Sequence, residues 1–248
     1  MLAKYQWAVM DQIALRWRAR TQDLASWGVA VKGRAISALF TGPRGTGKTM
    51  AAEVLANETR LAFCSIDLGR VVSKYLGETE KRLGALFDLA QEASALLFLD
   101  EADALFAKRG EVKDAHDRYA NIDVSGLMQR IEDYGGIVIL ATNLKQGIDP
   151  AFLRQLSYVV DFPLPDGAQR VKIWLRIFPA DTPVEGLDPE RLARLPLSGA
   201  NIRDIARSSA SLAASEGQPV RMSHLLRAAQ CECAKIDRQI DVAQIARP

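Results

Sequence analysis

The segment Gly42–Thr49 constrains the fold of this 248-residue chain more tightly than any other feature, because it matches the pattern G-x-x-x-x-G-K-[ST]. The apolar run Ile36–Phe40 before it predicts a strand, and Met50–Glu58 after it predicts a helix. Glycines let such a loop wrap its backbone N–H groups around a phosphate at the N-terminus of the helix. Lys48 then meets the β- and γ-phosphates of a nucleotide, and Thr49 offers its hydroxyl to Mg²⁺. The residues predicted to surround the phosphates are Gly42, Pro43, Arg44, Gly45, Thr46, Gly47, Lys48, Thr49 and Met50.

A glycine-rich turn with an exposed lysine is the alternative explanation of this segment. At average amino-acid frequencies the pattern arises by chance in about one chain of this length in a hundred. The strand before it and the helix after it lower that chance further, so we favour the phosphate-binding loop.

Short apolar runs alternate with helical stretches beyond this loop, as in a parallel sheet whose strands are joined by crossover helices. The run Ala95–Leu99 is apolar at every position, which is typical of a strand buried on both faces. The predicted fold class is therefore α/β, with a parallel sheet flanked by helices. Further strands are predicted over Leu61–Ile66, Ile137–Ala141 and Tyr158–Phe162, and a helix is predicted over Glu78–Glu92.

Strand signals stop after Pro165, and the rest of the chain is predicted to be helical. Ser198 and Ser223 are plausible N-caps, and Gly217 is a plausible C-terminal stop. We therefore divide the chain into an N-terminal helical linker (1–35), an α/β part (36–166) and a small all-α part (167–248). The helices predicted in the last part are Gln169–Phe178, Asp188–Leu195, Ser198–Glu216 and Ser223–Ile236.

Polar side chains follow two of the predicted strands, at the carboxyl edge of the sheet, where ligands of open α/β folds collect. Asp100 and Glu101 come directly after the run that ends at Leu99, and Asn143 comes shortly after Ala141. Asp100 would hold Mg²⁺, directly or through water, and Glu101 would orient and deprotonate an attacking water. Asn143 would hydrogen-bond the γ-phosphate or that water, although a turn residue that caps the strand is an equally good explanation. Together with the phosphate loop, these residues predict hydrolysis of ATP to ADP and phosphate.

The charge balance gives no bulk argument for binding nucleic acid or an acidic membrane, since 32 basic and 30 acidic side chains leave a formal charge of +2. Arg16, Arg18 and Arg20 form a basic group on a predicted N-terminal helix, where a solvated face is a commoner meaning than a nucleic-acid contact. The three cysteines lack the spacing of a disulfide framework or a metal site. No apolar stretch suits a membrane span or a signal peptide, so we expect a cytoplasmic protein with no membrane or nucleic-acid partner.

Four motifs follow one another here as they do in the AAA family of ATPases, which this chain resembles from Ile36 to its C-terminus. The resemblance implies a P-loop NTPase sheet flanked by helices, followed by a small all-α lid subdomain. The four motifs are Gly42–Thr49, Leu97–Asp103, Ala141–Asn143 and Asp149–Arg154.

Further stretches resemble one branch of this family, the clade of katanin, spastin and FtsH. Ser73–Glu78 resembles the first pore loop of that clade, and Leu197–Asn201 resembles the start of its lid helix. The closest likeness is to bacterial AAA ATPases associated with phage-tail-like contractile injection systems, which Glu111–Asn121 suggests.

The resemblance also implies a ring, a hexamer in this family, with ATP and Mg²⁺ bound between neighbouring subunits. Tyr75, beside Lys74, would project into the central pore and grip a polypeptide, because a flat aromatic ring can contact many sequences. A tyrosine packed beneath its own loop is the alternative. The leading hypothesis is therefore an ATPase that remodels or unfolds a protein partner.

One stretch departs from the family pattern. After Asp149–Arg154 the family continues through Gly-Arg-Phe-Asp-Arg, whose arginines reach the γ-phosphate of the neighbouring subunit. This chain continues through Gln155–Val160, two residues shorter, with Ser157 where an arginine would align. Arg154, the one arginine left, is the candidate for that trans-acting role, and a purely structural role is equally compatible with its position.

Two other classes of function stay open on the sequence. An assembly scaffold, in which ATP holds a ring together with slow or no turnover, is favoured by the missing arginines and opposed by Glu101. A nucleic-acid loader is the least favoured, because the chain has no room for a second motor domain and its charge is near neutral.

Overall fold

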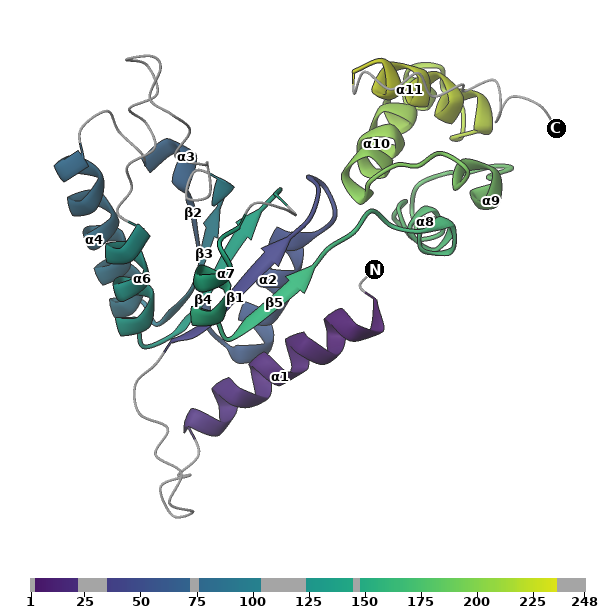
Figure 1. The fold of residues 1–248 in the computed structure, drawn as a ribbon. Helices are drawn as coiled ribbons and strands as arrows, with labels where there is room; N and C mark the ends of the chain where they lie inside the picture. Colours follow the sequence, from purple (N-terminus) through teal and green to yellow (C-terminus); the bar gives the residue numbers. More distant parts are fainter. Residues whose placement is uncertain (1–2, 22–34, 72–75, 104–123, 145–147, 236–248) are drawn as a thin grey trace. The chain divides into compact units, whose positions relative to one another are not determined.

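The computed structural model describes residues 3–21, 35–71, 76–103, 124–144 and 148–235 of the chain (Figure 1). Contacts between Cα atoms divide the chain into two compact units. The first unit comprises Leu2–Gly42 and Lys48–Phe162 and contains the sheet. The second comprises Pro43–Gly47 and Pro163–Pro248 and contains the C-terminal helices. Each unit has a hydrophobic core of its own.

The described residues of the first unit form a five-stranded parallel sheet in the order β2-β3-β4-β1-β5. β1 and β4 are buried along their whole length, as expected for strands that are covered on both faces. Because all the strands are parallel, their carboxyl ends lie at one edge of the sheet. The strands are β1 (Ile36–Thr41), β2 (Ala62–Asp67), β3 (Ala95–Asp100), β4 (Ile137–Thr142) and β5 (Tyr158–Asp161).

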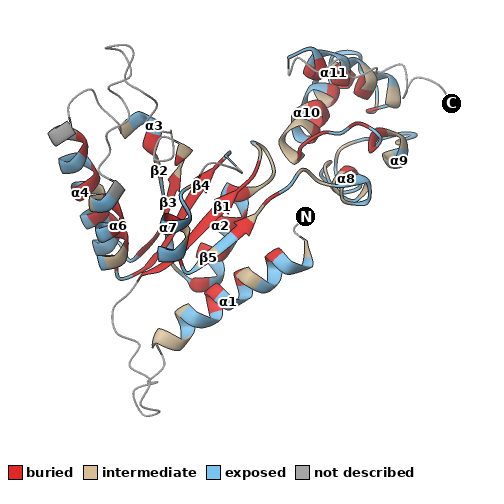
Figure 2. Cartoon of the chain, viewed as in Figure 1, coloured by how far each residue is buried: buried red, intermediate tan, exposed pale blue. Residues whose placement is uncertain are grey.

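Helices cover both faces of this sheet (Figure 1). On one face, Met10 of α1 and Leu55 of α2 share a core with Phe98 of β3. On the other face, Phe87 of α4 and Ile131 of α6 share a core with other side chains of the same strands. Figure 2 shows the buried sheet between helices whose outer faces are exposed. The helices of this unit are α1 (Lys4–Thr21), α2 (Lys48–Thr59), α3 (Leu68–Val71), α4 (Leu76–Glu92), α6 (Val124–Asp133) and α7 (Pro150–Gln155).

The second unit is helical and packs around the fully buried side chain of Trp174. Both of its capping boxes join a side chain to a backbone N–H in each direction, Asp166 with Gln169 before α8 and Ser198 with Asn201 before α10. The helices are α8 (Gly167–Trp174), α9 (Pro189–Leu192), α10 (Gly199–Ser215) and α11 (Met222–Lys235).

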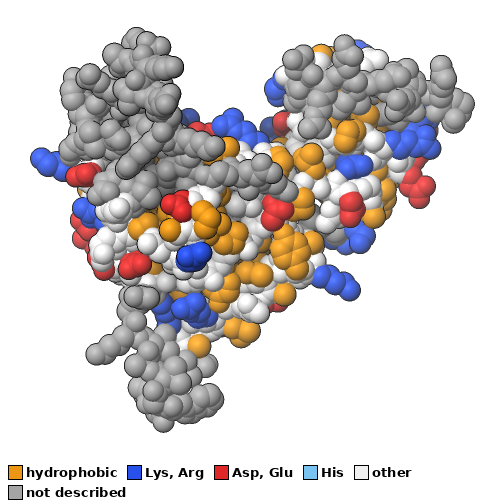
Figure 3. All heavy atoms as spheres, viewed as in Figure 1, with side chains coloured by type: hydrophobic (Ala, Val, Ile, Leu, Met, Phe, Trp, Pro, Cys, Tyr) orange, Lys and Arg blue, Asp and Glu red, His pale blue; other side chains and the backbone are white. Residues whose placement is uncertain are grey.

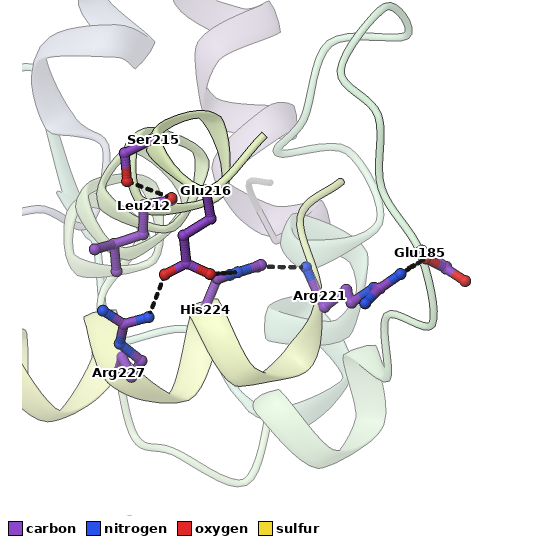
Figure 4. Close-up of polar contacts among 7 residues, drawn as sticks. All are labelled: Glu185, Leu212, Ser215, Glu216, Arg221, His224 and Arg227. Atoms are coloured by element: carbon purple, nitrogen blue, oxygen red, sulfur yellow. Dashed lines mark hydrogen bonds and ion pairs between the residues drawn. The ribbon is translucent and has the colours of Figure 1, made fainter. Parts of the chain in front are cut away.

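A chain of polar contacts ties the end of α10 to α11 (Figure 4). Glu216 accepts a hydrogen bond from Nη1 of Arg227 at 2.6 Å and lies 3.0 Å from Nε2 of the buried His224. Since Nδ1 of His224 accepts the backbone N–H of Arg221 at 3.0 Å, the neutral ring carries its proton on Nε2, where it faces Glu216. The hydrogen bonds from Arg227 and His224 hold the pKa of Glu216 below its ordinary value. The contacts of Glu216 thus join the end of α10 to α11, and Arg221, just before α11, reaches Glu185, in the segment before α9, at 2.8 Å.

The structure confirms the predicted fold class, and every predicted strand is present with ends shifted by at most one residue. Ser198 caps α10 as predicted, and Gly217 follows its end with a φ of 65°. The N-cap predicted at Ser223 is wrong, because α11 begins at Met222. The ring of His224 accepts the backbone N–H of Arg221, the residue before the helix.

Other helix predictions erred in length or were missing. The helix predicted to reach Phe178 ends at Trp174, and α3, α6 and α7 were not predicted. Of the described helices, none is both long enough and apolar enough to cross a membrane.

Ser198→Ala tests the capping of α10. It removes the hydroxyl that accepts the N–H of Asn201, so we expect the free energy of unfolding in urea to fall by about 1 kcal/mol. Ser211→Ala, on the same helix, removes a hydroxyl that bonds only within the helix and is the matched control, with an expected change within about 0.5 kcal/mol. Equal losses in the two variants would contradict the capping role.

Candidate active site

The loop Gly42–Thr49 joins β1 to α2, and its three glycines all have positive φ values, which side chains disfavour. They serve different purposes. A Cβ on Gly42 would lie 2.1 Å from the carbonyl oxygen of Phe162, so this glycine lets two backbone segments approach closely. A Cβ on Gly47 would meet nothing within 4 Å, so this position is glycine for its φ of 101° alone. The backbone of the loop is thus shaped by glycine at both ends.

Lys48, the first residue of α2, is buried, with 8% of its surface exposed. Its ammonium donates a short hydrogen bond to the carbonyl oxygen of Gly42 and a second, of 3.1 Å, to Oδ1 of Asn143. Thr49 and Met50 lie exposed in the same turn of the helix. The structure therefore brings the predicted lysine and the predicted asparagine into direct contact.

Asp103 holds the turn that contains Asn143. One oxygen of its carboxylate, Oδ1, accepts hydrogen bonds from the Thr142 hydroxyl and from the backbone N–H groups of Asn143 (2.9 Å) and Leu144 (3.3 Å). The other, Oδ2, accepts from Nδ2 of Asn143 at 3.0 Å. Partial burial raises the pKa of Asp103, but these four hydrogen bonds outweigh that effect and leave its pKa below the ordinary value. Asp103 is therefore ionised at neutral pH.

Asp100 and Glu101 lie at the carboxyl end of β3. Asp100 is half-buried, and its Oδ1 accepts the N–H of Glu101 at 2.9 Å. Glu101 has a φ of 55°, a left-handed backbone that non-glycine residues seldom adopt. Its Oε2 and Oδ1 of Asp67 both lie within 3.2 Å of the point where a Cβ on Gly69 would stand. The carboxylate of Glu101 is thus turned toward the junction of β2 and α3.

The remaining predicted residues lie elsewhere. Arg154 is exposed in the last turn of α7, before the start of β5 and away from the carboxyl edge of the sheet. Arg44 is exposed, and the hydroxyl of Thr46 donates to the carbonyl oxygen of Pro43 at 2.8 Å. The predictions that concern Lys74 and Tyr75 fall outside the described residues, as does the stretch Glu111–Asn121.

Sequence reasoning did not assign a role to Asp103 or to the hydroxyl of Thr142. One feature of the sequence could have indicated a role for Asp103. It lies three residues after Asp100, close to the predicted edge of the sheet, where a carboxylate needs hydrogen-bond or ionic partners. Those partners belong to a strand 39 and 40 residues further along the chain, so the sequence alone does not identify them.

Comparison with models of known protein families shows to which family the chain belongs. The sequence model of the "ATPase family associated with various cellular activities (AAA)" matches residues 38–164, which is just over half of the chain. The chain belongs to the AAA family of ATPases. The matched region contains the loop, both strand ends and α7, so the site described above is that of an AAA domain.

Several curated AAA proteins are similar to this chain. The "26S proteasome regulatory subunit 6B homolog" of Dictyostelium discoideum is 36% identical over 180 residues, which cover 69% of this chain and 45% of that protein. The "Proteasome-activating nucleotidase" of Pyrococcus horikoshii is 33% identical over 187 residues, covering 72% and 47%. The "Cell division cycle protein 48 homolog" of Archaeoglobus fulgidus is 35% identical over 179 residues, covering 69% and 24%. The matches thus span about half or less of the length of these relatives.

The family prediction is confirmed by these matches. The narrower assignments, to the clade of katanin, spastin and FtsH and to contractile injection systems, gain no support from relatives of the proteasomal and Cdc48 types.

Two glycine variants distinguish a glycine that the fold requires from a glycine that ATP binding requires. Gly47→Ala meets open space, so we expect a folded protein whose strained loop binds ATP at least tenfold more weakly. Gly42→Ala collides with the backbone of Phe162, so we expect loss of the folded state, at a cost of more than about 3 kcal/mol. Circular dichroism melting and binding of a fluorescent ATP analogue measure the two effects. A Gly42→Ala protein as stable as the wild type would contradict this assignment.

Proposed function

We propose that the chain binds ATP together with Mg²⁺ and hydrolyses ATP to ADP and phosphate. The observation that carries the proposal is the convergence of three strand ends: Lys48 follows β1, Asp100 and Glu101 end β3, and Asn143 follows β4. A cation, two carboxylates and an amide thus share the edge where ligands of open α/β sheets bind. Membership of a family of ATPases supports the same conclusion.

The oxygen donors at this edge suit Mg²⁺. Thr49 offers an exposed hydroxyl and Asp100 a half-buried carboxylate, and both are hard ligands of the kind that Mg²⁺ prefers. Within the described ranges, no three Asp, Glu, His or Cys side chains gather closely enough to hold a metal ion by themselves. Mg²⁺ commonly takes one or two protein ligands and completes its shell with phosphates and water. When bound here it would neutralise charge on the β- and γ-phosphates.

Lys48 and Glu101 would carry the remaining chemistry. The ammonium of Lys48 donates hydrogen bonds to two neutral oxygens, those of Gly42 and Asn143, and an anionic phosphate oxygen would make a stronger hydrogen bond than either of them. The carboxylate of Glu101 would accept the proton of the attacking water. The left-handed backbone of Glu101 is a strained conformation of the kind that concentrates at functional sites.

Lys48→Ala and Glu101→Gln test these roles. Lys48→Ala should reduce ATP affinity at least tenfold in calorimetry, because it deletes the charge that meets the phosphates. Glu101→Gln should keep that affinity and slow phosphate release by about 10² to 10⁴, since the amide retains the shape and loses the basicity. Lys172→Ala and Glu58→Gln, both exposed and neither assigned a role in the site, are the controls. An unaltered rate in Glu101→Gln would exclude it as the base.

Arg154 stands at the wrong edge of the sheet to serve its own nucleotide. The backbone N–H of Ser157, just after it, donates to the carbonyl oxygen of Ser37 near the start of β1, whereas the phosphate loop follows the end of β1. From Ser37 to Gly42 the strand spans about 17 Å. We propose that Arg154, which is exposed, acts on the nucleotide of a neighbouring copy in a ring.

Mixing two inactive variants tests this trans action. Arg154→Ala and Glu101→Gln should each slow phosphate release at least a hundredfold. In an equal mixture, about a quarter of the interfaces should pair an intact Glu101 with an intact Arg154, and that share of the wild-type rate should return. Light scattering with a slowly hydrolysed ATP analogue confirms assembly first. No recovery in assembled mixtures would show that Arg154 does not act across the interface.

A ring-forming ATPase that unfolds or remodels a polypeptide is the cellular role we propose, with a hexamer as the expected ring. Sequence similarity to a proteasome-activating nucleotidase supports this role. Lys74 and Tyr75 would line the pore, which remains a prediction from the sequence. The division at residues 36 and 166, the cytoplasmic location and the katanin-like and injection-system assignments stay proposals on the same footing.

A slow ATP-dependent scaffold is the second candidate, and the exposed Ser157 in place of an arginine is the observation that favours it. If ATP assembles the chains into a ring and phosphate release from that ring is not detectable, the scaffold would be supported. Basic and acidic side chains of the described residues are interspersed on the face that Figure 3 shows, so this face does not favour a nucleic-acid loader.

A further inference from the structure

The side-chain amide of Asn143 has a donor end and an acceptor end, and its neighbours determine which end faces which way. Its Nδ2 lies 3.0 Å from Oδ2 of Asp103, and its Oδ1 lies 3.1 Å from Nζ of Lys48. A carboxylate can only accept hydrogen bonds and an ammonium can only donate them. Turning the amide around would set acceptor against acceptor and donor against donor, so both neighbours favour the same orientation.

We infer that Asp103 is a positioning residue that holds the carbonyl end of the Asn143 amide toward the phosphate loop, so that Asn143 acts there as a hydrogen-bond acceptor. The kinetic consequence rests on the proposed hydrolysis of ATP, whereas the geometry does not. Asp103 achieves this with one carboxylate, because Oδ1 fixes the backbone of the turn while Oδ2 binds the amide.

The sequence left two roles open for Asn143, a hydrogen bond to the γ-phosphate or one to the attacking water. A carbonyl oxygen that faces the phosphate loop favours the water. A phosphate oxygen carries no hydrogen and gains nothing from a carbonyl oxygen, whereas a water molecule can donate to it. Glu101 also accepts. A water that donates one O–H to Glu101 and the other to Asn143 would turn a lone pair of its oxygen toward phosphorus. Asp103 would thereby contribute to orienting the nucleophile without touching it.

The rival explanation is that Asp103 has a purely structural role and only stabilises the turn at the end of β4. The variant Asp103→Asn distinguishes this role from the orientation of Asn143. The new amide oxygen can still accept the hydroxyl of Thr142 and the backbone N–H groups of the turn. Its NH₂ group, however, would then face Nδ2 of Asn143, donor against donor, so the hydrogen bond that holds the amide is lost. The variant therefore preserves the turn and removes the acceptor that orients Asn143.

We expect Asp103→Asn to lower kcat at least tenfold while the KM for ATP and the melting temperature stay close to those of the wild type. Asp149→Asn is the matched control, because the carboxylate of Asp149 also accepts a turn N–H, that of Ala151 at 2.8 Å, in the same unit. Its kcat should be unchanged. A variant Asp103→Asn that melts earlier with an unchanged kcat would overturn the proposal.

A double-mutant cycle tests whether Asp103 acts through Asn143. In the background of Asn143→Ala, the further change Asp103→Asn should leave kcat within about a factor of two, because the group that it orients is already gone. Losses that multiply would show that Asp103 acts by another route and would also overturn the proposal.

A nuclear magnetic resonance measurement decides the geometry even if the wild type hydrolyses no ATP, an outcome that would refute the proposed function alone. One Nδ2 proton of Asn143, assigned by the loss of its signal in Asn143→Ala, should lie downfield through its bond to the carboxylate. Asp103→Asn should abolish that displacement, and Asp149→Asn should preserve it. A wild-type resonance at the position of a solvated amide, or one unchanged in Asp103→Asn, would refute the assigned orientation.

Discussion

Pairing of β1 with β4 is the interaction on which the rest of the site depends. Its register sets Thr41 opposite Thr142, and the N–H of Gly42 continues the ladder to the carbonyl oxygen of Thr142 at 3.1 Å. The phosphate loop and Asn143 therefore begin side by side, which is why the ammonium of Lys48, the first residue of α2, reaches the amide. A slip of one strand by one residue would turn each of its side chains to the opposite face of the sheet, into the other core, so the packing of the two cores fixes the position of the polar groups.

The acidic side chains at the carboxyl edge have different hydrogen-bond and ion-pair partners. Asp103 is satisfied by four donors from the end of β4, which neutralise much of its charge without a cation. Asp67 has Arg70 at 3.0 Å. Oδ1 of Asp100 accepts the N–H of Glu101 at 2.9 Å. On our proposal, Mg²⁺ would add a positive partner for Asp100 and the attacking water a donor for Glu101, which would offset part of the cost of burying these carboxylates.

The fold followed from the sequence to the extent that local patterns carry it. Apolar runs such as Ala95–Leu99 located strands to within one residue, because burial on both faces leaves no polar position. Contacts across strands were a different matter. Asp103 gained its role from β4, and only the order β2-β3-β4-β1-β5 makes these strands neighbours. Ser223 is not the cap because α11 already begins at Met222, and the ring of His224 accepts the N–H of Arg221, the residue before the helix.

The placement of Arg154 carries a consequence for any ring. In a parallel sheet the residues that precede strands and those that follow them lie at opposite edges, and packing on both faces keeps these edges apart as a rigid body. A chain of this design cannot bring its own Arg154 to its own phosphate loop by local motion. On our proposal, two copies must therefore meet through different surfaces, one carrying the loop and the other carrying α7. Contacts of this unlike kind generate a closed ring when the rotation between copies closes. Turnover would then require assembly, because the group that meets the charge developing on the γ-phosphate belongs to the next subunit.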